Sequence, residues 1–124
     1  MINLLAIFYT LYAFMFFYSN KYGYSLLRYM YMKKNINVFL SVEIIFVILT
    51  SLIIFINQPL NWIITIQMLL HIAGIVWVVV DPDNYYEMIE NSLNVDGANA
   101  ENITVITLLT FAIMALYSKV IFTL

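Results

Sequence analysis

The stretch from Val38 to Ile56 is almost wholly apolar, yet it contains one acidic residue, Glu43. A helix of about twenty apolar residues crosses the hydrocarbon core of a bilayer, because each residue adds about 1.5 Å of length. Counted from the end of the stretch that follows Lys33 and Lys34, Glu43 lies roughly 7–9 Å inside the membrane. An ionisable side chain at that depth is costly, so its presence indicates a function. The alternative is a carboxylate that snorkels to the interface or stays protonated within a helix bundle.

The composition places the whole chain in a membrane. Of its 124 residues, 65% are hydrophobic and only 10% are charged, whereas a soluble domain is about half apolar and about a quarter charged. We therefore predict an all-α integral membrane protein. A net charge of −2 with few cations argues against nucleic-acid binding. The absence of cysteine excludes disulfides and thiolate ligands, and a single histidine argues against a zinc site, so we expect no metal and no cofactor.

Four spans are expected, at residues 2–18, 37–57, 62–80 and 103–123. The first is too long and too aromatic for the core of a signal peptide, so we expect a retained helix. Pro59 should end the second span at a short turn. The segment 81–102 carries six of the seven acidic residues and is expected to be a solvated loop, with room for a short surface helix over 85–93. Several tyrosines near the first span are expected in an interfacial aromatic belt: Tyr12, Tyr18, Tyr22, Tyr24, Tyr29 and Tyr31.

The positive charges predict the orientation. Four of the five lie between the first two spans: Lys21, Arg28, Lys33 and Lys34. By the positive-inside rule this segment faces the cytoplasm or the mitochondrial matrix, which places the N-terminus outside. Lys119 lies near the end of the fourth span and can snorkel to the interface there.

The third span also carries polar residues in an apolar setting. Gln67 and His71 are four residues apart and share a helix face. His71 lies roughly 13 Å from the inner end of its span, within about one turn of the level of Glu43. A Glu–His pair in a low-dielectric setting shares a proton readily, so Glu43 and His71 are candidates for a proton relay. The alternatives are a histidine that hydrogen-bonds a backbone carbonyl, and a haem ligand acting with a methionine or a second subunit's histidine.

The segment KKNINVFLSVEIIFVIL, residues 33–49, resembles the second helix of one family, the NuoK or chain 4L subunit of proton-pumping NADH–quinone oxidoreductase (respiratory complex I). The resemblance implies that Glu43 belongs to a polar axis along which protons move. Members also carry a second buried glutamate in the third span, and His71 stands at the comparable place in MLLHIAGIVWVVV. The acidic segment and the fourth span are additional to the three spans of the family.

This resemblance implies a small subunit without its own redox centre, surrounded by lipid and by other hydrophobic subunits of a respiratory-chain complex that reduces ubiquinone. Abundant Ile, Asn, Tyr, Phe and Met suit an AT-rich organellar gene, so the mitochondrial inner membrane is expected, with a bacterial plasma membrane as the alternative. Two other functional classes remain open. One is a structural or assembly subunit of another respiratory or ATP-synthase complex, and the other is a stand-alone membrane protein of the holin or immunity type.

The orientation can be tested with single cysteines, because the chain has none of its own. Lys21→Cys and Asn84→Cys should react with a membrane-impermeant thiol reagent only from the inner side of the membrane. Asn57→Cys should react only from the outer side. Labelling of the first two variants from outside would overturn the predicted orientation.

Overall fold

The structure, a computed structural model, describes residues 1–23, 25–31, 33–56 and 60–122, and for residues 95–98 it describes the backbone alone. Over these residues the chain is helical and has no strand. The elements are α1 (Ile2–Lys21), α2 (Leu26–Tyr31), the 3-10 helix η1 (Lys33–Asn35), α3 (Ile36–Ile56), α4 (Trp62–Val80) and α5 (Pro82–Phe122). Four helices in the described part are long and apolar enough to cross a membrane. The predicted all-α membrane fold with four spans is confirmed.

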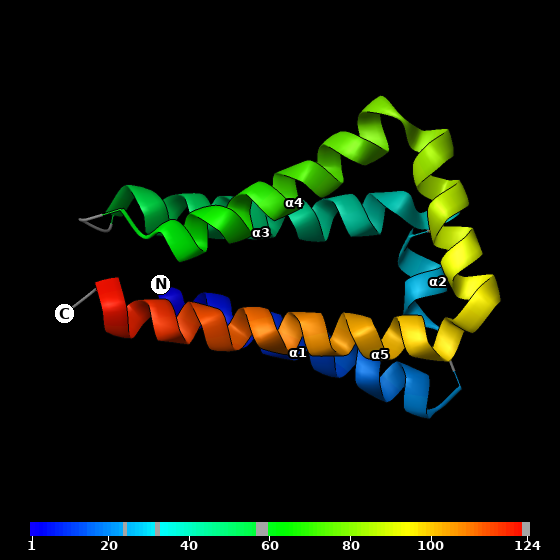
Figure 1. Ribbon diagram of the computed structural model, residues 1–124, viewed down its shortest axis with the longest axis horizontal. Helices are drawn as coiled ribbons and strands as arrows, with labels where there is room; N and C mark the ends of the chain where they lie inside the picture. Colours follow the sequence, from blue (N-terminus) through cyan, green and yellow to red (C-terminus); the bar gives the residue numbers. More distant parts are fainter. Residues whose placement is uncertain (24, 32, 57–59, 123–124) are drawn as a thin grey trace.

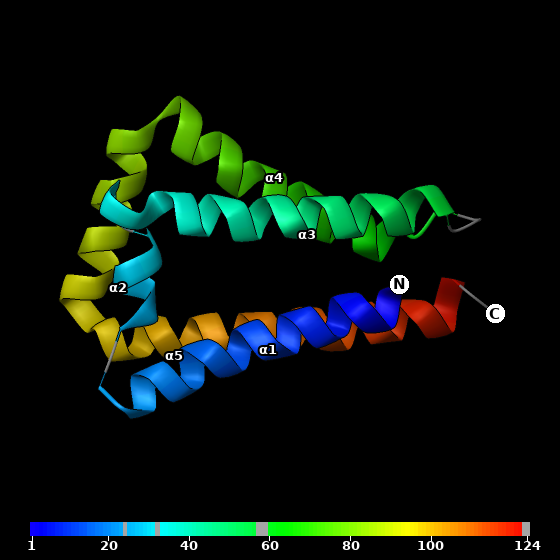
Figure 2. The ribbon, with the colours of Figure 1, turned by 180° about the vertical axis from the view of Figure 1, so that it is seen from behind.

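The four long helices form two layers. Helices α3 and α4 lie together in one layer, and α1 packs along the last part of α5 in the other (Figures 1 and 2). Both chain termini lie at one end of the bundle, which we call the terminus end. Helix α2 and the first part of α5 lie across the opposite end, which we call the α2 end. Which end faces the cytoplasm stays a prediction.

Each span buries one face and exposes the rest, as expected for helices surrounded by lipid. In α3 the exposed residues include Ile44, Ile45 and Ile48, which are as apolar as the buried ones. The buried residues recur at alternating intervals of four and three positions, which is the spacing of one helix face: Phe39, Glu43, Phe46, Thr50 and Ile53. Hydrophobicity therefore identifies the spans but does not distinguish the face that meets lipid from the face that meets protein.

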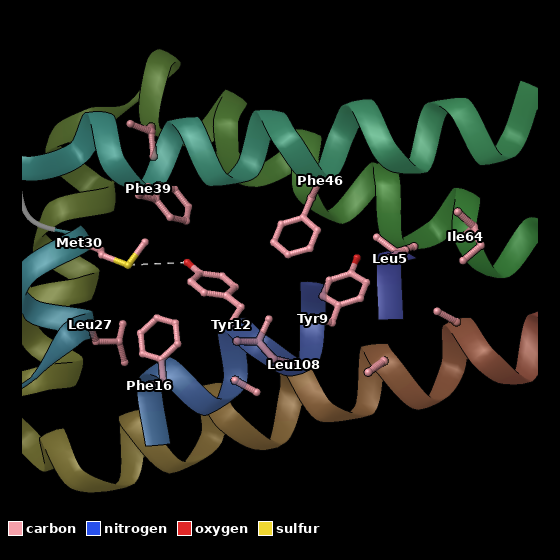
Figure 3. Close-up of a cluster of buried hydrophobic side chains, with 14 of the residues drawn as sticks. Leu5, Tyr9, Tyr12, Phe16, Leu27, Met30, Phe39, Phe46, Ile64 and Leu108 are labelled. Carbon is pink, nitrogen blue, oxygen red and sulfur yellow. Dashed lines mark hydrogen bonds between the residues drawn. The ribbon is translucent and has the colours of Figure 1, made fainter. Parts of the chain in front are cut away.

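The buried centre of the bundle is rich in aromatic rings (Figure 3). Tyr12 packs against Phe16 and Phe46 there, at ring-centroid distances of 5.0 and 5.9 Å. The expectation that Tyr12 belongs to an interfacial belt is wrong, because its ring faces the protein interior. Tyr18, Tyr22 and Tyr29 are exposed, which suits an interfacial belt. Tyr31 is half-buried, and Tyr24 lies outside the described residues.

The segment expected to be an acidic loop, residues 81–102, is instead helical from Pro82 onward. Asp81 ends α4 and accepts the Tyr85 N–H through its carbonyl oxygen, and Pro82 occupies the first helical position, where its missing N–H costs nothing. Tyr85, Ile89 and Leu93 are buried at four-residue intervals, so one face of this helix covers the α2 end of the bundle. The high content of polar residues suggested a loop, but it reflects the solvated opposite face.

Residues 57–59 between α3 and α4 lie outside the described residues, so the role expected of Pro59 stays a prediction. The residue that starts α4 is Asn61, and its side chain is completely buried. Its Oδ1 accepts the Ile64 N–H at 3.1 Å, and its Nδ2 donates to Ser118 Oγ at 3.0 Å. One side chain therefore caps α4 and joins it to α5 at the terminus end.

Removing this cap should weaken the bundle. We expect Asn61→Ala to lower the free energy of unfolding by about 1–2 kcal/mol, because it removes both the cap and an interhelical hydrogen bond. Reversible unfolding of the detergent-solubilised protein, followed by circular dichroism, measures this change. Asn37→Ala is the matched control, since the Asn37 side chain is exposed. Equal stability of the two variants would contradict the assigned role of Asn61.

Candidate functional site

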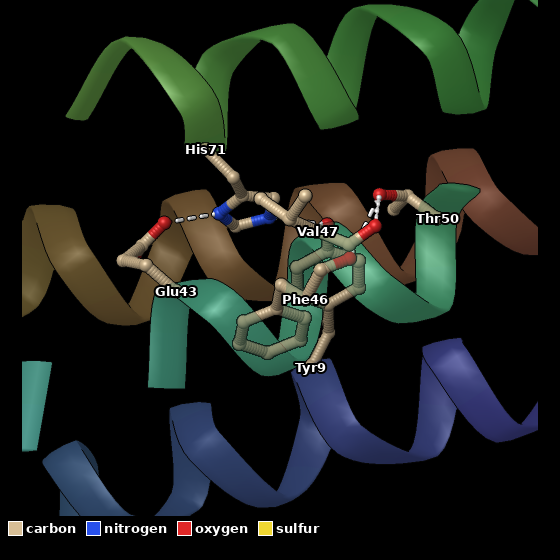
Figure 4. Close-up of polar contacts among 6 residues, drawn as sticks. All are labelled: Tyr9, Glu43, Phe46, Val47, Thr50 and His71. Atoms are coloured by element: carbon tan, nitrogen blue, oxygen red, sulfur yellow. Dashed lines mark hydrogen bonds and ion pairs between the residues drawn. The ribbon is translucent and has the colours of Figure 1, made fainter. Parts of the chain in front are cut away.

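Glu43 and His71 are in direct contact. Glu43 lies on the buried face of α3 and His71 on the buried face of α4, and His71 Nδ1 is 2.6 Å from Glu43 Oε2 (Figure 4). Both side chains are almost completely buried, with residue exposures of 8% for Glu43 and 7% for His71. The two ionisable residues singled out by their depth in the sequence therefore form one hydrogen-bonded pair between adjacent helices.

A third residue, Tyr9 of α1, extends this pair into a chain. Its hydroxyl oxygen lies 2.7 Å from His71 Nε2, and its side chain is completely buried. Both imidazole nitrogens thus have a protein partner, and the chain Tyr9–His71–Glu43 joins α1, α4 and α3. We refer to these three residues as the triad.

Two phenylalanines enclose the triad. The Phe46 ring lies parallel to the His71 ring at 4.8 Å and to the Tyr9 ring at 4.6 Å, so it covers both. Phe111 of α5 contacts the same two rings edge-on, at 5.5 Å from Tyr9 and 6.2 Å from His71. The aromatic walls restrict the imidazole to one orientation and shield its hydrogen bonds from water, which strengthens them.

The triad can keep its contacts in two protonation states. With Glu43 ionised and the imidazole neutral, the Tyr9 hydroxyl donates to Nε2 and Nδ1–H donates to the carboxylate. After one more proton is bound, Nε2–H donates to the Tyr9 oxygen, and Glu43 and Nδ1 share the other proton. The net charge of the triad changes from −1 to zero, while both contacts remain. The arrangement can therefore accept and release one proton without losing its hydrogen bonds.

Further buried polar groups lie on the terminus side of the triad. Gln67, one turn from His71 on the same face of α4, donates through Nε2 to the Phe111 carbonyl oxygen at 3.0 Å. Its Oε1 is buried and has no hydrogen-bond partner among the described residues. Asn61 and Ser118 follow towards the terminus end. Together these residues, from the start and buried face of α4 and from α5, form a series of polar side chains between the triad and the terminus end.

A separate carboxylate lies at the α2 end. Glu101 of α5 is 1% exposed and accepts hydrogen bonds from the Ser25 hydroxyl and from the Leu27 N–H, the latter at 3.4 Å. Its second oxygen, Oε2, is buried without a partner in the described part of the chain. These contacts fix α2 against α5, which is a structural role. The sequence pattern placed Glu101 among the acids of a solvated loop and did not indicate its burial.

A cavity of about 580 Å³ reaches the triad from the α2 end. Glu43 and His71 form part of its wall, together with residues of α2, α3 and α5. Tyr85 also lines it, and its hydroxyl is buried without a hydrogen-bond partner among the described residues. Burial and the proximity of Tyr31 and Glu43 raise the pKa of Tyr85 well above its ordinary value, so this phenol stays neutral at physiological pH.

Nothing in the described residues suggests a protein-held metal, since no group of three His, Cys, Asp or Glu side chains is close enough to bind one. The candidate site consists of the triad and the cavity. Sequence analysis predicted Glu43 and His71 but missed Tyr9. The available signal was that Tyr9, Tyr12 and Phe16 recur at helical spacing, but the same span has aromatic residues on its other faces too.

The hydrogen bonds of the triad can be observed directly, because His71 is the only histidine. In protein labelled with ¹⁵N-histidine, Tyr9→Phe should shift the Nε2 resonance, and Glu43→Gln should shift the Nδ1 resonance. Tyr9→Phe keeps the ring and should lower the free energy of unfolding by only about 1 kcal/mol. Tyr12→Phe is the matched control, since the Tyr12 hydroxyl faces Met30 Sδ at 4.0 Å. Imidazole resonances that are identical in all variants would contradict the triad.

Comparison with known proteins gives no relative from which a function could be inferred. No protein-family model matches the chain, and no curated protein or solved structure matches it significantly.

Proposed function

We propose that the chain carries protons within a membrane and that the triad is its proton-transfer element. The observation that carries this proposal is the buried contact of Glu43 with His71, extended by Tyr9. Carboxylate, imidazole and phenol are groups that exchange protons. Here the imidazole of His71 contacts the carboxylate of Glu43 at 2.6 Å and the hydroxyl of Tyr9 at 2.7 Å. Ionisable residues within membrane spans are rare and commonly mark proton relays.

Burial favours a proton over a larger ion at the centre of the triad. The aromatic rings of Phe46 and Phe111 leave no oxygen-rich shell around His71, which a hard metal cation would require. A proton needs no such shell, because it moves along existing hydrogen bonds. Binding it also removes the net negative charge of the triad, which is costly to keep in an apolar interior.

Polar groups towards both ends of the bundle support transfer across it. The cavity provides access to Glu43 from the α2 end. On the other side of the triad, Gln67 offers a buried oxygen that has no hydrogen-bond partner in the described part of the chain. Asn61 and Ser118 continue the polar series towards the terminus end.

As a specific assignment, we propose a small hydrophobic subunit of a proton-pumping NADH–quinone oxidoreductase, in the mitochondrial inner membrane or a bacterial plasma membrane. The support is the resemblance of residues 33–49 and the position of His71 in the third span. In that setting the partners are the neighbouring hydrophobic subunits and lipid. The fourth span is additional to the three-span family: α5 is an integral helix of this bundle and supplies Phe111 to the wall of the triad.

The second candidate is a structural subunit of another membrane complex or a stand-alone protein of the holin or immunity type. The observation that favours it is the large apolar area on all four spans, which includes Phe55 at 83% exposure and suits contact with other membrane helices as well as lipid. In this case the triad would only hold α1, α3 and α4 together.

The deciding experiment is proton flux into liposomes that contain the purified protein and a pH-sensitive dye. We expect Glu43→Gln to reduce flux by at least about tenfold, because an amide keeps the size of the side chain but cannot bind a proton. Glu43→Asp should retain part of the flux, and His71→Leu should reduce it in protein that still folds. Glu90→Gln, which removes an exposed carboxylate of α5, is the control.

Unchanged flux in Glu43→Gln and His71→Leu would exclude the relay and leave the structural role. If the wild-type protein is silent in liposomes, the same variants are measured in native membranes as NADH-driven proton pumping. Proteins that comigrate with the chain in a native gel decide between the candidate settings. A large oxidoreductase would support the specific assignment, whereas homo-oligomers alone would favour the stand-alone protein.

A further inference from the structure

The cavity beside the triad has the dimensions and chemistry of a ligand site. Helix α4 leans away from the rest of the bundle towards its C-terminal end (Figure 1), and the cavity lies among α3, α4 and α5 there. Its volume of about 580 Å³ is within the range of small-molecule sites. Such sites are mostly apolar, with a few polar groups that orient the ligand.

Five aromatic side chains contribute to the cavity wall, and the rest of the wall is mainly aliphatic. Tyr31, Phe39, Trp77, Tyr85 and Phe111 all line it. The faces of such rings attract positive charge, and cages of several rings are the usual way in which proteins recognise organic ammonium groups.

The charged residues of the wall also favour a cationic ligand. Glu43 is the only acidic residue of the lining, and the described lining has no lysine or arginine. Thr104 and Thr107 add hydroxyl groups, which can orient a ligand but do not balance a charge. A negative group at one end of an aromatic cavity is complementary to a bulky monovalent organic cation, and it disfavours anions.

We propose that this cavity binds a lipophilic organic cation, such as a quaternary ammonium or phosphonium compound, in exchange for the proton of the Glu43–His71 pair. The proposal rests on the protonation change proposed for the triad and names a substrate class for the same site. It does not depend on whether the bundle acts alone or within a complex.

The exchange follows from charge balance. With Glu43 ionised and His71 neutral, the site has a net charge of −1. Either one proton or one monovalent cation brings it to zero, and binding both would leave an uncompensated positive charge in an apolar interior. Cation binding therefore releases the proton to water, and proton binding expels the cation, with one charge exchanged for one charge.

The groups that face Glu43 from the surrounding helices do not disturb this balance. They are Tyr9 and Tyr12 from α1, Tyr31 from α2, His71 from α4 and Tyr85 from α5. Burial keeps the phenols of Tyr31 and Tyr85 neutral by raising their pKa. Among these groups, the exchange is therefore assigned to the Glu43–His71 pair.

Tetraphenylphosphonium is a suitable probe, and Trp77 in the cavity wall is a natural reporter. Trp62→Phe removes the other of the two tryptophans, which lies at the opposite end of α4. In this background, added tetraphenylphosphonium should quench Trp77 fluorescence with saturation and release protons into a weakly buffered detergent solution. Triphenylphosphine oxide, a neutral compound of similar shape, should release none.

Two variants distinguish specific binding from partition into the micelle. Glu43→Gln should weaken tetraphenylphosphonium binding by at least about tenfold and abolish proton release. Gly74→Leu should also weaken binding, because Gly74 lines the cavity and a Cβ added there meets only the tip of the Phe39 ring, at 3.9 Å. Glu90→Gln, outside the cavity, should bind like the parent protein. Circular dichroism and monodisperse elution verify that each variant is folded.

The outcomes separate this inference from the proposed function. No saturable quenching, binding without proton release, or binding that is unchanged in Glu43→Gln would each overturn the exchange. Proton flux that depends on Glu43 would in that case still support the relay. Conversely, cation binding with proton release, without Glu43-dependent proton flux in either liposomes or native membranes, would support the exchange and exclude a free proton relay.

Discussion

A carboxylate inside a hydrocarbon span has to find its partner within the protein, and most of this bundle is arranged around that constraint. Water cannot compensate Glu43 at its depth, so α4 has to place His71 within hydrogen-bond distance. The second imidazole nitrogen then needs a partner as well, and Tyr9 provides it from α1. Removing one member of a buried ionic pair costs about 3–5 kcal/mol in proteins, because the remaining charge is left without compensation.

The same constraint explains how helices with little sequence contrast find one arrangement. All faces of the spans are apolar, so transfer from water to lipid does not distinguish one face from another. Polar side chains do distinguish the helix faces, because each one has to meet a hydrogen-bond partner at the same depth in the bundle. Asn61 joins α4 to α5 near the terminus end, and Glu101 joins α5 to α2 at the other end. Between these two levels, the triad fixes the register of α1, α3 and α4.

Sequence patterns predicted the parts of the fold that depend on length and apolarity alone. The third span runs from Trp62 to Val80 as expected, because a long apolar run between breakers leaves little choice. Over residues 82–102 only a short helix at 85–93 was expected, and the continuous helix was missed because its apolar positions Tyr85, Ile89 and Leu93 are diluted by polar neighbours. There the helix lies at the end of the bundle, where only one face is buried.

The part of the candidate site that could be predicted from the sequence is the part that depends on how deep an ionisable residue lies in its span. Glu43 and His71 are conspicuous because a charged or basic group is rare in such a span, and antiparallel neighbours at similar depth can be brought together. Tyr9 is not conspicuous, since a tyrosine is common in a membrane helix and its partner is visible only in three dimensions. The enclosure of the triad by Phe46 and Phe111 could not be predicted for the same reason. It depends on which helix faces pack against each other, and the sequence does not specify this.

The geometry also sets a requirement on any transport by this site. The triad is accessible from the cavity on the α2 side, whereas Phe46 and Phe111 cover it elsewhere. A proton or a cation that enters from the α2 end therefore leaves on the other side only after these contacts change. The nearest polar group on that side is Gln67, whose buried Oε1 lacks a partner in the described residues and could accept a hydrogen bond from a displaced imidazole. Since Gln67 lies one turn from His71 on the same helix, a small rotation or tilt of α4 changes both contacts together, which makes α4 the element whose motion would alternate access.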